Sequence, residues 1–241
     1  MSANRLGLPE TIAACLFDLD GVITQTAKVH DQAWKELFDA FLKERSEKTG
    51  EPFVPFDQNR DYIQYVDGKP RIDGVRSFLE SRHIQLEESE VQQLAARKDK
   101  LFLDLIHRNG VDVYEGTIRY LHAAREAGLK LAVVSSSKNT TEVLRAAKLE
   151  NMFDGQVDGV IAEQERLKGK PAPDTYLRAA TILHTTAQNA AVYEDALAGV
   201  EAGRAGRFGI VVGVDRDTLS KELLEHGADV VVGDLAELLQ G

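Results

Sequence analysis

The 241-residue sequence predicts an α/β fold: a Rossmann-like parallel sheet core with an inserted helical cap domain. Short apolar runs without polar alternation recur along the chain, as in strands that are buried on both faces. Stretches with helical periodicity separate these runs, which is the order of a parallel sheet covered by helices. One long interval near the N-terminus breaks this order and has a helical pattern throughout. We therefore expect one covered sheet with one insertion.

Five strands are expected, and each run ends before small or polar residues: IAACLF (12–17), LAVV (131–134), AAVY (190–193), GIVVG (209–213) and DVVV (229–232). Helices are expected at 116–127, 139–147 and 174–183, and Gly128 is a natural C-cap for the first. Cys15, the only cysteine, lies inside the first run, so we expect a buried strand residue and no intrachain disulfide. In parallel sheets ligands bind beyond the carboxyl ends of the strands, so polar residues after these runs are candidate site residues.

The interval from 26 to 110 is predicted to be a helical cap domain, with residues 1–25 and 111–241 forming the catalytic core. Apolar residues between Ala33 and Leu42 follow the i, i+3, i+4 spacing of an amphipathic helix. A second apolar stripe runs from Val91 to Ile106, and Ser89 with Gln92 suggests a capping box at its start. The polar segment 43–60 holds two of the six prolines and is expected to be a loop.

Composition narrows the class of partner. A formal net charge of −10 and a pI near 5.1 argue against nucleic acid or an anionic membrane as the main partner. These values do not exclude a small anionic substrate, because a bound cation can make the electrostatic potential inside one cleft positive. No apolar run approaches the roughly 20 residues of a membrane span, and the N-terminus lacks the layout of a signal peptide. We expect a cytoplasmic protein that is a monomer or a weak dimer.

Carboxylates follow two of the expected strands. Asp18 and Asp20 come after the first strand, where side chains two residues apart share one face. Such a pair repels unless a cation neutralises it. Glu194 and Asp195 follow another strand and add oxygen ligands, and an all-oxygen set favours Mg²⁺ over Zn²⁺. The alternatives are a simple strand-to-helix turn for the first pair and a helix cap for the second.

A polar segment follows the 131–134 run. Its hydroxyls, backbone N–H groups and lysine at a helix N-terminus would make an anion cradle, formed by Ser135, Ser136, Ser137, Lys138 and Asn139. A serine N-cap is the alternative interpretation. Lys170 precedes Pro171 and Pro173, which stiffen the chain around it. A lysine fixed in this way can pair with an aspartate nucleophile and a phosphoryl group, whereas an ordinary loop lysine would be solvated.

The order of these four motifs resembles that of the haloacid dehalogenase superfamily, along nearly the whole chain. Asp-x-Asp comes first, then Ser after a strand, then Lys-Pro, then Glu-Asp after another strand. The resemblance implies an aspartyl-phosphate enzyme that uses Mg²⁺. It assigns catalysis to Asp18, Asp20, Ser135 and Lys170, and metal binding to Asp18, Asp20, Glu194 and Asp195.

Finer features are similar to the beta-phosphoglucomutase family. The opening Asp-Leu-Asp-Gly-Val-Ile-Thr at 18–24 is followed by residues of that family's type, and so are the segments at 135–139 and 170–174. Gly68 and Arg71 match a cap loop of that family in spacing, while Gln25 and Asp67 depart from its pattern. The resemblance implies that substrate is bound by Thr26, His30, Trp34, Gly68, Lys69, Arg71, Ser136, Ser137, Lys138 and Asn139. Packing within the helical domain is the alternative for His30 and Trp34.

The function implied is the Mg²⁺-dependent interconversion of β-glucose 1-phosphate and glucose 6-phosphate. It would proceed through phosphorylated Asp18 and a bisphosphate, with a small-molecule sugar phosphate as the partner. A phosphatase acting on sugar phosphates would share every core residue and is the first alternative. A non-catalytic binding module is the second, and it is disfavoured because Asp18, Asp20, Glu194 and Asp195 are all present.

Overall fold

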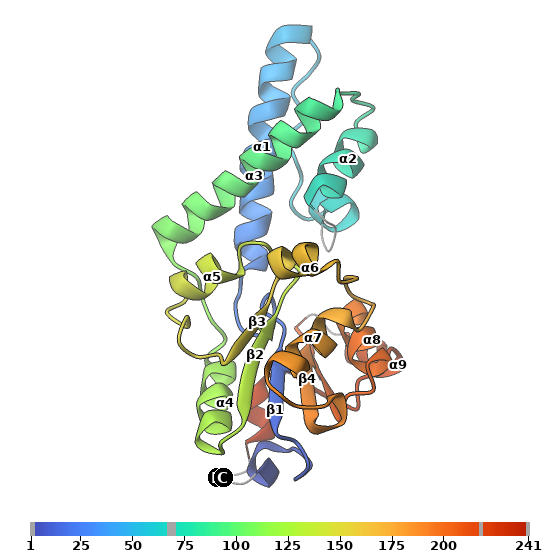
Figure 1. Cartoon of the computed structure of the whole chain (residues 1–241). Coiled ribbons are helices and arrows are strands. Elements are labelled where there is room, and N and C mark those ends of the chain that lie inside the picture. The colour runs from blue at the N-terminus through green and yellow to red at the C-terminus, as the bar shows by residue number, and fades with distance from the viewer. Residues whose placement is uncertain (1–2, 67–70, 217–218, 240–241) are drawn as a thin grey trace. The chain divides into compact units, whose positions relative to one another are not determined.

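The computed structural model describes residues 3–66, 71–216 and 219–239. The chain divides into two compact units, shown together in Figure 1. The core unit comprises residues 1–26 and 111–241, and the helical unit comprises Ala27–Gly110. The helical unit is therefore inserted after the first strand of the core.

One parallel sheet of six strands forms the centre of the core unit in the part of the chain described. Its strand order is β3-β2-β1-β4-β5-β6, and the strands are β1 (Ala14–Phe17), β2 (Lys130–Val134), β3 (Gly155–Val157), β4 (Ala190–Glu194), β5 (Ile210–Val214) and β6 (Val230–Val232). In register, Phe17 is opposite Val133 of β2 and Tyr193 of β4. The residues that follow these three positions therefore emerge side by side at the carboxyl end of the sheet. The expected α/β fold class is confirmed.

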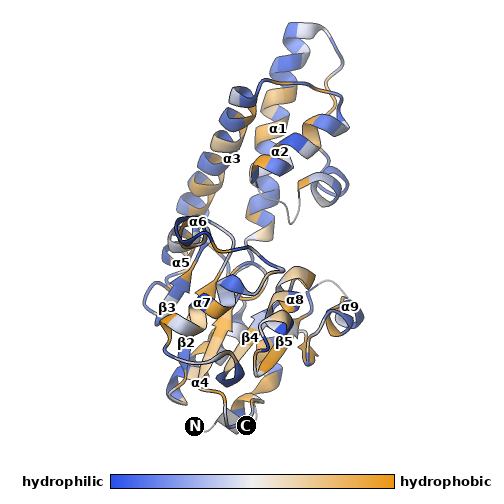
Figure 2. Ribbon diagram, turned by 45° about the vertical axis from the view of Figure 1, so that its right-hand side comes forward, coloured by the Kyte–Doolittle hydropathy of each residue, from blue (hydrophilic) through white to orange (hydrophobic). Residues whose placement is uncertain are grey.

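Helices cover both faces of this sheet because successive strand residues point to opposite sides. On one face, Phe17 and Tyr193 stack with ring centroids 4.3 Å apart, and Tyr120 of α4 (Glu115–Glu126) packs on both rings. On the other face, Leu16 and Val192 share a buried cluster with three helices, α7 (Asp174–Ile182), α8 (Leu197–Ala205) and α9 (Ser220–Glu225). Two further helices, α5 (Thr140–Ala146) and α6 (Gly159–Glu165), come before and after β3 in the sequence. Figure 2 shows the strands as the most apolar part of the core unit.

Short helical turns complete the core unit. They are η1 (Ala3–Leu6), η3 (Ala187–Asn189) and η4 (Leu235–Leu238). In the described ranges, no helix combines the length and the apolar character needed to cross a membrane.

The helical unit has an aromatic core of its own. It contains α1 (Ala27–Thr49), a π-helical turn η2 (Tyr62–Val66), α2 (Arg71–Ser81) and α3 (Glu88–Asn109). Phe38 lies at the centre, with its ring centroid 5.3 Å from that of Phe56 and 4.0 Å from that of Phe78. Alternating apolar and polar bands along α1 and α3 are visible in Figure 2. The buried residues of this unit form a hydrophobic cluster separate from that of the core unit.

The expectation of a loop over 43–60 is wrong for its first seven residues, since α1 continues to Thr49. Residues 43–49 are polar all round but consist mainly of good helix formers, and Glu44 pairs with Lys48 one turn later at 2.7 Å. Gly50, at φ +76°, then ends the helix. The expected capping box of Ser89 and Gln92 is wrong. Glu87 and Glu90 form the capping box at the start of α3.

Residues 51–61 have little regular structure but are anchored to the helical unit. The backbone N–H of Phe56 donates to Asp39 at 2.8 Å, and its carbonyl accepts from Lys35 at 2.9 Å. Asp61, 1% exposed, accepts from the Arg82 guanidinium at 2.6 Å and from the Asp57 N–H at 3.1 Å. Burial opposes ionisation of Asp61, but these donors and Arg60 lower its pKa overall. The segment is thus held by buried polar contacts.

Candidate active site

The carboxyl ends of β1, β2 and β4 meet around one ammonium group. Lys170 contacts the carboxylates of Asp18 and Glu194 and donates to the Val134 carbonyl at 3.3 Å. The side chains of Lys170, Asp18 and Glu194 are 11%, 12% and 1% exposed. A residue 152 positions from Asp18 in sequence is therefore its direct charge partner in a nearly dry site.

Three carboxylates share this site. Oxygens of Asp18, Glu194 and Asp195 all lie within 4.8 Å of one another. Burial raises the pKa of Asp18 to about 8, against the opposing effect of Lys170 and with the help of Glu194. Burial and the Glu194 charge also raise the pKa of Asp195 well above its usual range. Burial works against a charged Lys170, yet its two carboxylate partners raise its pKa overall.

This donor set fits a hard divalent cation. Three carboxylates against one ammonium leave an excess of negative charge in a buried space, and each ligand atom is an oxygen. In the part of the chain described, this metal-type cluster consists of Asp18, Glu194 and Asp195, so the carboxylate of Asp20 lies outside it. The residues present therefore suit Mg²⁺.

Asp20 is held by a threonine network. The Thr26 hydroxyl donates to the Asp20 carboxylate, and the Thr26 and Thr24 hydroxyls are 3.0 Å apart. The Thr24 hydroxyl also donates to the Leu19 carbonyl at 3.2 Å, and both threonines are fully buried. The Thr26 hydroxyl therefore restrains the Asp20 carboxylate through one oxygen. This contact also places Thr26, an expected substrate-binding residue, against the second aspartate of the first motif.

Gly21 allows the loop after β1 to pass close to the carboxylates. Its φ of +81° favours glycine, and a Cβ there would lie 1.8 Å from Asp195 Oδ2. The Gly21 N–H donates to the Thr24 carbonyl at 2.9 Å and closes a tight turn. Even one methyl group at this position would displace Asp195.

The serine segment combines a turn with a buried hydroxyl. Ser135, 3% exposed, accepts from the Ser137 N–H at 3.1 Å, and the Ser137 hydroxyl accepts from the Asn139 N–H at 3.1 Å. Asn139 is the N-cap residue of α5. Ser136 and Lys138 are exposed, and Lys138 pairs with Glu163 at 2.7 Å. The serine hydroxyls therefore hold the turn before α5, whose N-cap is Asn139 and not the serine of the alternative interpretation, and the buried Ser135 lies directly after β2.

Sequence reasoning missed Tyr176. Its hydroxyl donates to Glu194 Oε1 at 2.8 Å, and Lys170 Nζ lies 5.0 Å from its ring centroid. Burial and the Glu194 charge raise the pKa of Tyr176 well above its usual range, so the phenol keeps its proton and remains a donor. The sequence signal for Tyr176 is its place three residues after Pro173, in the first turn of α7 and close to the Lys170 motif.

In the helical unit, His30 belongs to a cationic and aromatic cluster. Its Nδ1 lies 2.6 Å from the Lys98 ammonium, and its ring stacks on Phe102 at 4.2 Å. Burial, then Lys98 and Arg71, lower the pKa of His30 well below its usual range. Lys98 is 4% exposed and lies over the rings of Trp34 and Phe102, at 5.1 and 5.0 Å. The sequence signal for this cluster is Lys98, a lysine within the apolar stripe of α3.

The remaining expected cap residues differ in their settings. Trp34 is 4% exposed and stacks on Phe38 at 5.2 Å, which is the packing role that the sequence left open. Arg71 forms an ion pair with Asp99, and each side chain is 31% exposed. Gly68 and Lys69 lie outside the described residues.

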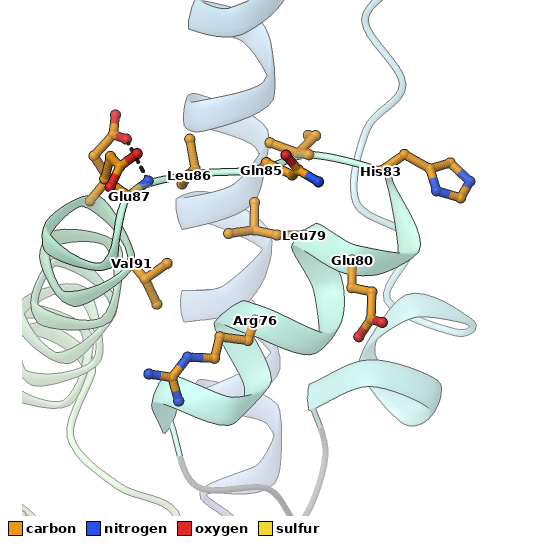
Figure 3. A pocket seen from close by; sticks show the side chains of 10 residues that line it. Arg76, Leu79, Glu80, His83, Gln85, Leu86, Glu87 and Val91 are labelled. Carbon is orange, nitrogen blue, oxygen red and sulfur yellow. Dashed lines mark hydrogen bonds between the residues drawn. The ribbon is translucent and has the colours of Figure 1, made fainter.

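An open hollow of about 690 Å³ lies in the helical unit, between α2 and the start of α3 (Figure 3). Arg76, Glu80, His83 and Glu87 line it, and Leu79 lies at its apolar side. The expected site residues are not among those that line it, and Arg76 already pairs with Glu88 at 2.8 Å.

The fold and site together define the class of protein. The chain belongs to the haloacid dehalogenase-like hydrolases, whose family model matches residues 12–207. It is a phosphoryl-transfer enzyme. The beta-phosphoglucomutase of Mycobacterium tuberculosis is 53% identical to it over 246 residues, which cover 97% of this chain and 94% of that protein. The beta-phosphoglucomutase of Bacillus subtilis is 32% identical over 93% of this chain and 91% of its own length.

Among solved structures, the beta-phosphoglucomutase of Clostridium difficile has a similar fold. It superimposes with a TM-score of 0.73 at 28% identity, covering 94% of this chain and 93% of that one. The expected membership of the haloacid dehalogenase superfamily, with a beta-phosphoglucomutase-like sequence, is confirmed.

Proposed function

We propose that this enzyme interconverts β-glucose 1-phosphate and glucose 6-phosphate, with Asp18 carrying the phosphoryl group. The observation that carries the proposal is the contact of buried Lys170 with both Asp18 and Glu194 beside a third carboxylate. An ammonium here favours the ionised form of Asp18 needed for attack. The 53% identity to a beta-phosphoglucomutase over nearly the full chain supports the choice of substrate.

In the proposed reaction, phosphorylated Asp18 donates its phosphoryl group to the free hydroxyl of a hexose monophosphate. The hydroxyl oxygen forms the new P–O bond, the bond from phosphorus to Asp18 breaks, and Asp20 accepts the hydroxyl proton. The bisphosphate then presents its other phosphate, and Asp18 takes that group while Asp20 returns the proton to the leaving oxygen. Lys170 and the Ser135 hydroxyl stabilise charge on the transferring oxygens.

Asp18, Glu194 and Asp195 would hold Mg²⁺, and the resemblance to the haloacid dehalogenase superfamily adds Asp20 to the proposed ligands. The ion would supply positive charge for the phosphoryl oxygens and offset repulsion among the carboxylates. Tyr176 keeps Glu194 oriented by its 2.8 Å hydrogen bond. These residues would serve a mutase and a phosphatase alike.

The choice between the two depends on a second phosphate site and on exclusion of water. Within the core unit, Thr26 and Ser136–Asn139 are proposed as substrate-binding residues. In the helical unit, His30, Gly68, Lys69 and Arg71 are proposed as substrate-binding residues. Trp34, which is buried, would support His30 through the packing around Lys98.

The deciding experiment is an incubation with β-glucose 1-phosphate, Mg²⁺ and a trace of the corresponding bisphosphate. We expect glucose 6-phosphate to accumulate with little free phosphate. Release of phosphate without glucose 6-phosphate would replace the mutase by a sugar phosphatase. Absence of any Mg²⁺-dependent turnover on a broad panel of phosphate esters would favour a binding module.

A further inference from the structure

Arg216 reaches from the segment after β5 to the loop after β1, far away in sequence. Its Nε donates to the Gly21 carbonyl at 2.8 Å, and one terminal nitrogen donates to the Gly233 carbonyl at 2.7 Å. The other terminal nitrogen lies 3.5 Å from the Val22 carbonyl. The guanidinium also stacks on the Tyr114 ring, with Cζ 3.5 Å from the centroid. One planar group thus joins three separate segments of the core unit.

The position of the Gly21 carbonyl affects the residues on either side of it in the site. Gly21 directly follows Asp20, and its Cα packs against the Asp195 carboxylate so closely that a Cβ would overlap Oδ2. A shift of this peptide group would therefore move the backbone of Asp20 and change the space left for Asp195. Backbone hydrogen bonds close the turn, among them the 2.9 Å bond from the Gly21 N–H to the Thr24 carbonyl.

Tyr114, on which the Arg216 guanidinium stacks, connects the loop after β1 to the start of α4. Its N–H donates to the Ile23 carbonyl at 3.0 Å, and Val113 before it forms a bridge with Thr24. The guanidinium therefore lies between the loop of the first motif and the segment that enters α4. Stacking plus several directed donors requires the planar fork of arginine, which a lysine ammonium does not reproduce.

We propose that Arg216 is a positioning residue for phosphoryl transfer: by holding the Gly21 carbonyl against Tyr114 and Gly233, it sets the direction of the Asp20 carboxylate. It does not touch the reacting groups itself. This inference rests on the role of Asp20 as general acid and base under the proposed function. Loss of the clamp should slow the steps that need proton transfer and spare those that do not.

The test compares Arg216→Lys with the wild type in two reactions. One is turnover of β-glucose 1-phosphate, and the other is phosphorylation of Asp18 by acetyl phosphate, whose acetate leaving group needs no general acid. We expect kcat for the hexose to fall by at least about tenfold, a part of the ~10²- to 10⁴-fold that general acid–base catalysis supplies. KM and the rate of Asp18 phosphorylation should change by less than about twofold.

Arg125→Lys is the matched control. Arg125 also holds two backbone carbonyls, those of Asn151 and Met152 at 2.9 and 3.0 Å, but at the opposite end of α4. This variant should leave both rates unchanged. Tyr114→Leu removes only the stacking surface and should reproduce the loss in hexose kcat to a smaller extent, which also decides the matter if Arg216→Lys does not fold.

A double-mutant cycle with Asp20→Asn tests whether Arg216 acts through Asp20. In that background Arg216→Lys should cause no further loss of the residual hexose turnover. Three results would overturn the proposal: an unchanged hexose kcat, equal losses in both reactions, or fully additive losses with Asp20→Asn. If the wild type releases phosphate and makes no glucose 6-phosphate, the mutase proposal fails instead, and the same comparisons apply to the kcat of phosphate release.

Discussion

At the scale of single residues, charge balance around Lys170 explains how the site can work. Two buried carboxylates, those of Asp18 and Glu194, and the partly buried Asp195 surround one ammonium, and the pKa of Asp18 is raised to about 8 while that of Asp195 also rises. A divalent cation would remove this excess charge and favour ionised Asp18. Without the cation, the same excess of negative charge would favour the protonated form of Asp18, which is the group that has to attack.

Replacing Asp18 by asparagine tests its role as the nucleophile. The substitution keeps the shape of the side chain but removes the oxygen that would form the bond to phosphorus. We expect turnover to fall by at least about 10³-fold, since loss of a covalent nucleophile removes most of the catalysed rate. Steady-state assays with β-glucose 1-phosphate, alongside thermal unfolding to verify the fold, measure this. An active Asp18→Asn enzyme would mean that another residue is the nucleophile.

Binding of Mg²⁺ should be coupled to proton release. Protons and the cation compete for the oxygens of Asp18 and Asp195. The pKa of Asp18 is raised to about 8, so its proton must leave when the cation binds near neutral pH, and the pKa of Asp195 is raised as well. The affinity should therefore weaken as the pH falls from 8 to 6, by up to about tenfold per pH unit for each proton displaced.

Calorimetric titration in two buffers of different ionisation enthalpy measures the protons released. Asp18→Asn should release fewer of them than the wild type. The same affinity at pH 6 and at pH 8 would contradict this description of the cluster.

At the scale of elements, the sequence predicted best where burial dictates residue type. The central strands are continuous apolar runs, and β1, β2 and β4 lie where the runs predicted them. β3, with the sequence Gly-Gln-Val, is a three-residue edge strand that pairs only with β2 and carries no such run, so it was missed. Its existence depends on the neighbouring strand and not on local composition.

The same distinction applies to the site. Asp18, Ser135 and Glu194 could be predicted because the carboxyl ends of parallel strands meet at one edge. For Tyr176 the sequence indicates its place in the first turn of a helix but not its contact with Glu194, and Arg216 contacts the loop after β1 from a segment whose position depends on tertiary packing. Sequence spacing carries little information about such contacts.

The 51–61 segment should stabilise the helical unit through Asp61. Asp61→Asn removes the charge that compensates Arg82, whose side chain is 17% exposed against 2% for Asp61. We expect the free energy of unfolding to fall by about 3 kcal/mol, because a buried ion pair that loses one partner leaves the other uncompensated. Asp73→Asn removes an exposed partner of Arg76 and should cost less than about 0.5 kcal/mol.

Urea denaturation of both variants measures the difference. Equal stability losses for Asp61→Asn and Asp73→Asn would show that the segment is not held by this buried contact.

At the scale of the whole molecule, the proposed function divides chemistry and substrate choice between two units with separate apolar cores. The core unit holds the clustered carboxylates and Lys170. The helical unit contains Arg71, paired with Asp99, and the partly buried His30 beside the buried Lys98. The proposed mutase activity therefore depends on groups in the helical unit that simple ester hydrolysis does not require.

Arg71→Ala should separate the two kinds of reaction. A substrate with a second phosphate loses a charge-assisted partner, so kcat/KM for β-glucose 1-phosphate should fall by about 10- to 100-fold. Hydrolysis of a small activated phosphate ester, which has one phosphate, should change by less than about threefold. Parallel assays of both substrates decide the matter. Equal losses would remove Arg71 from the second phosphate site.

The most direct test of the central claim follows a labelled phosphoryl group from Asp18. The enzyme is phosphorylated with labelled acetyl phosphate, the label is assigned to Asp18 by peptide mapping, and β-glucose 1-phosphate is added in a rapid-quench apparatus. We predict that the label appears first in the hexose bisphosphate, faster than it is lost to water without sugar. Label that leaves Asp18 only as inorganic phosphate, at a rate unaffected by the sugar, would contradict the proposed mutase.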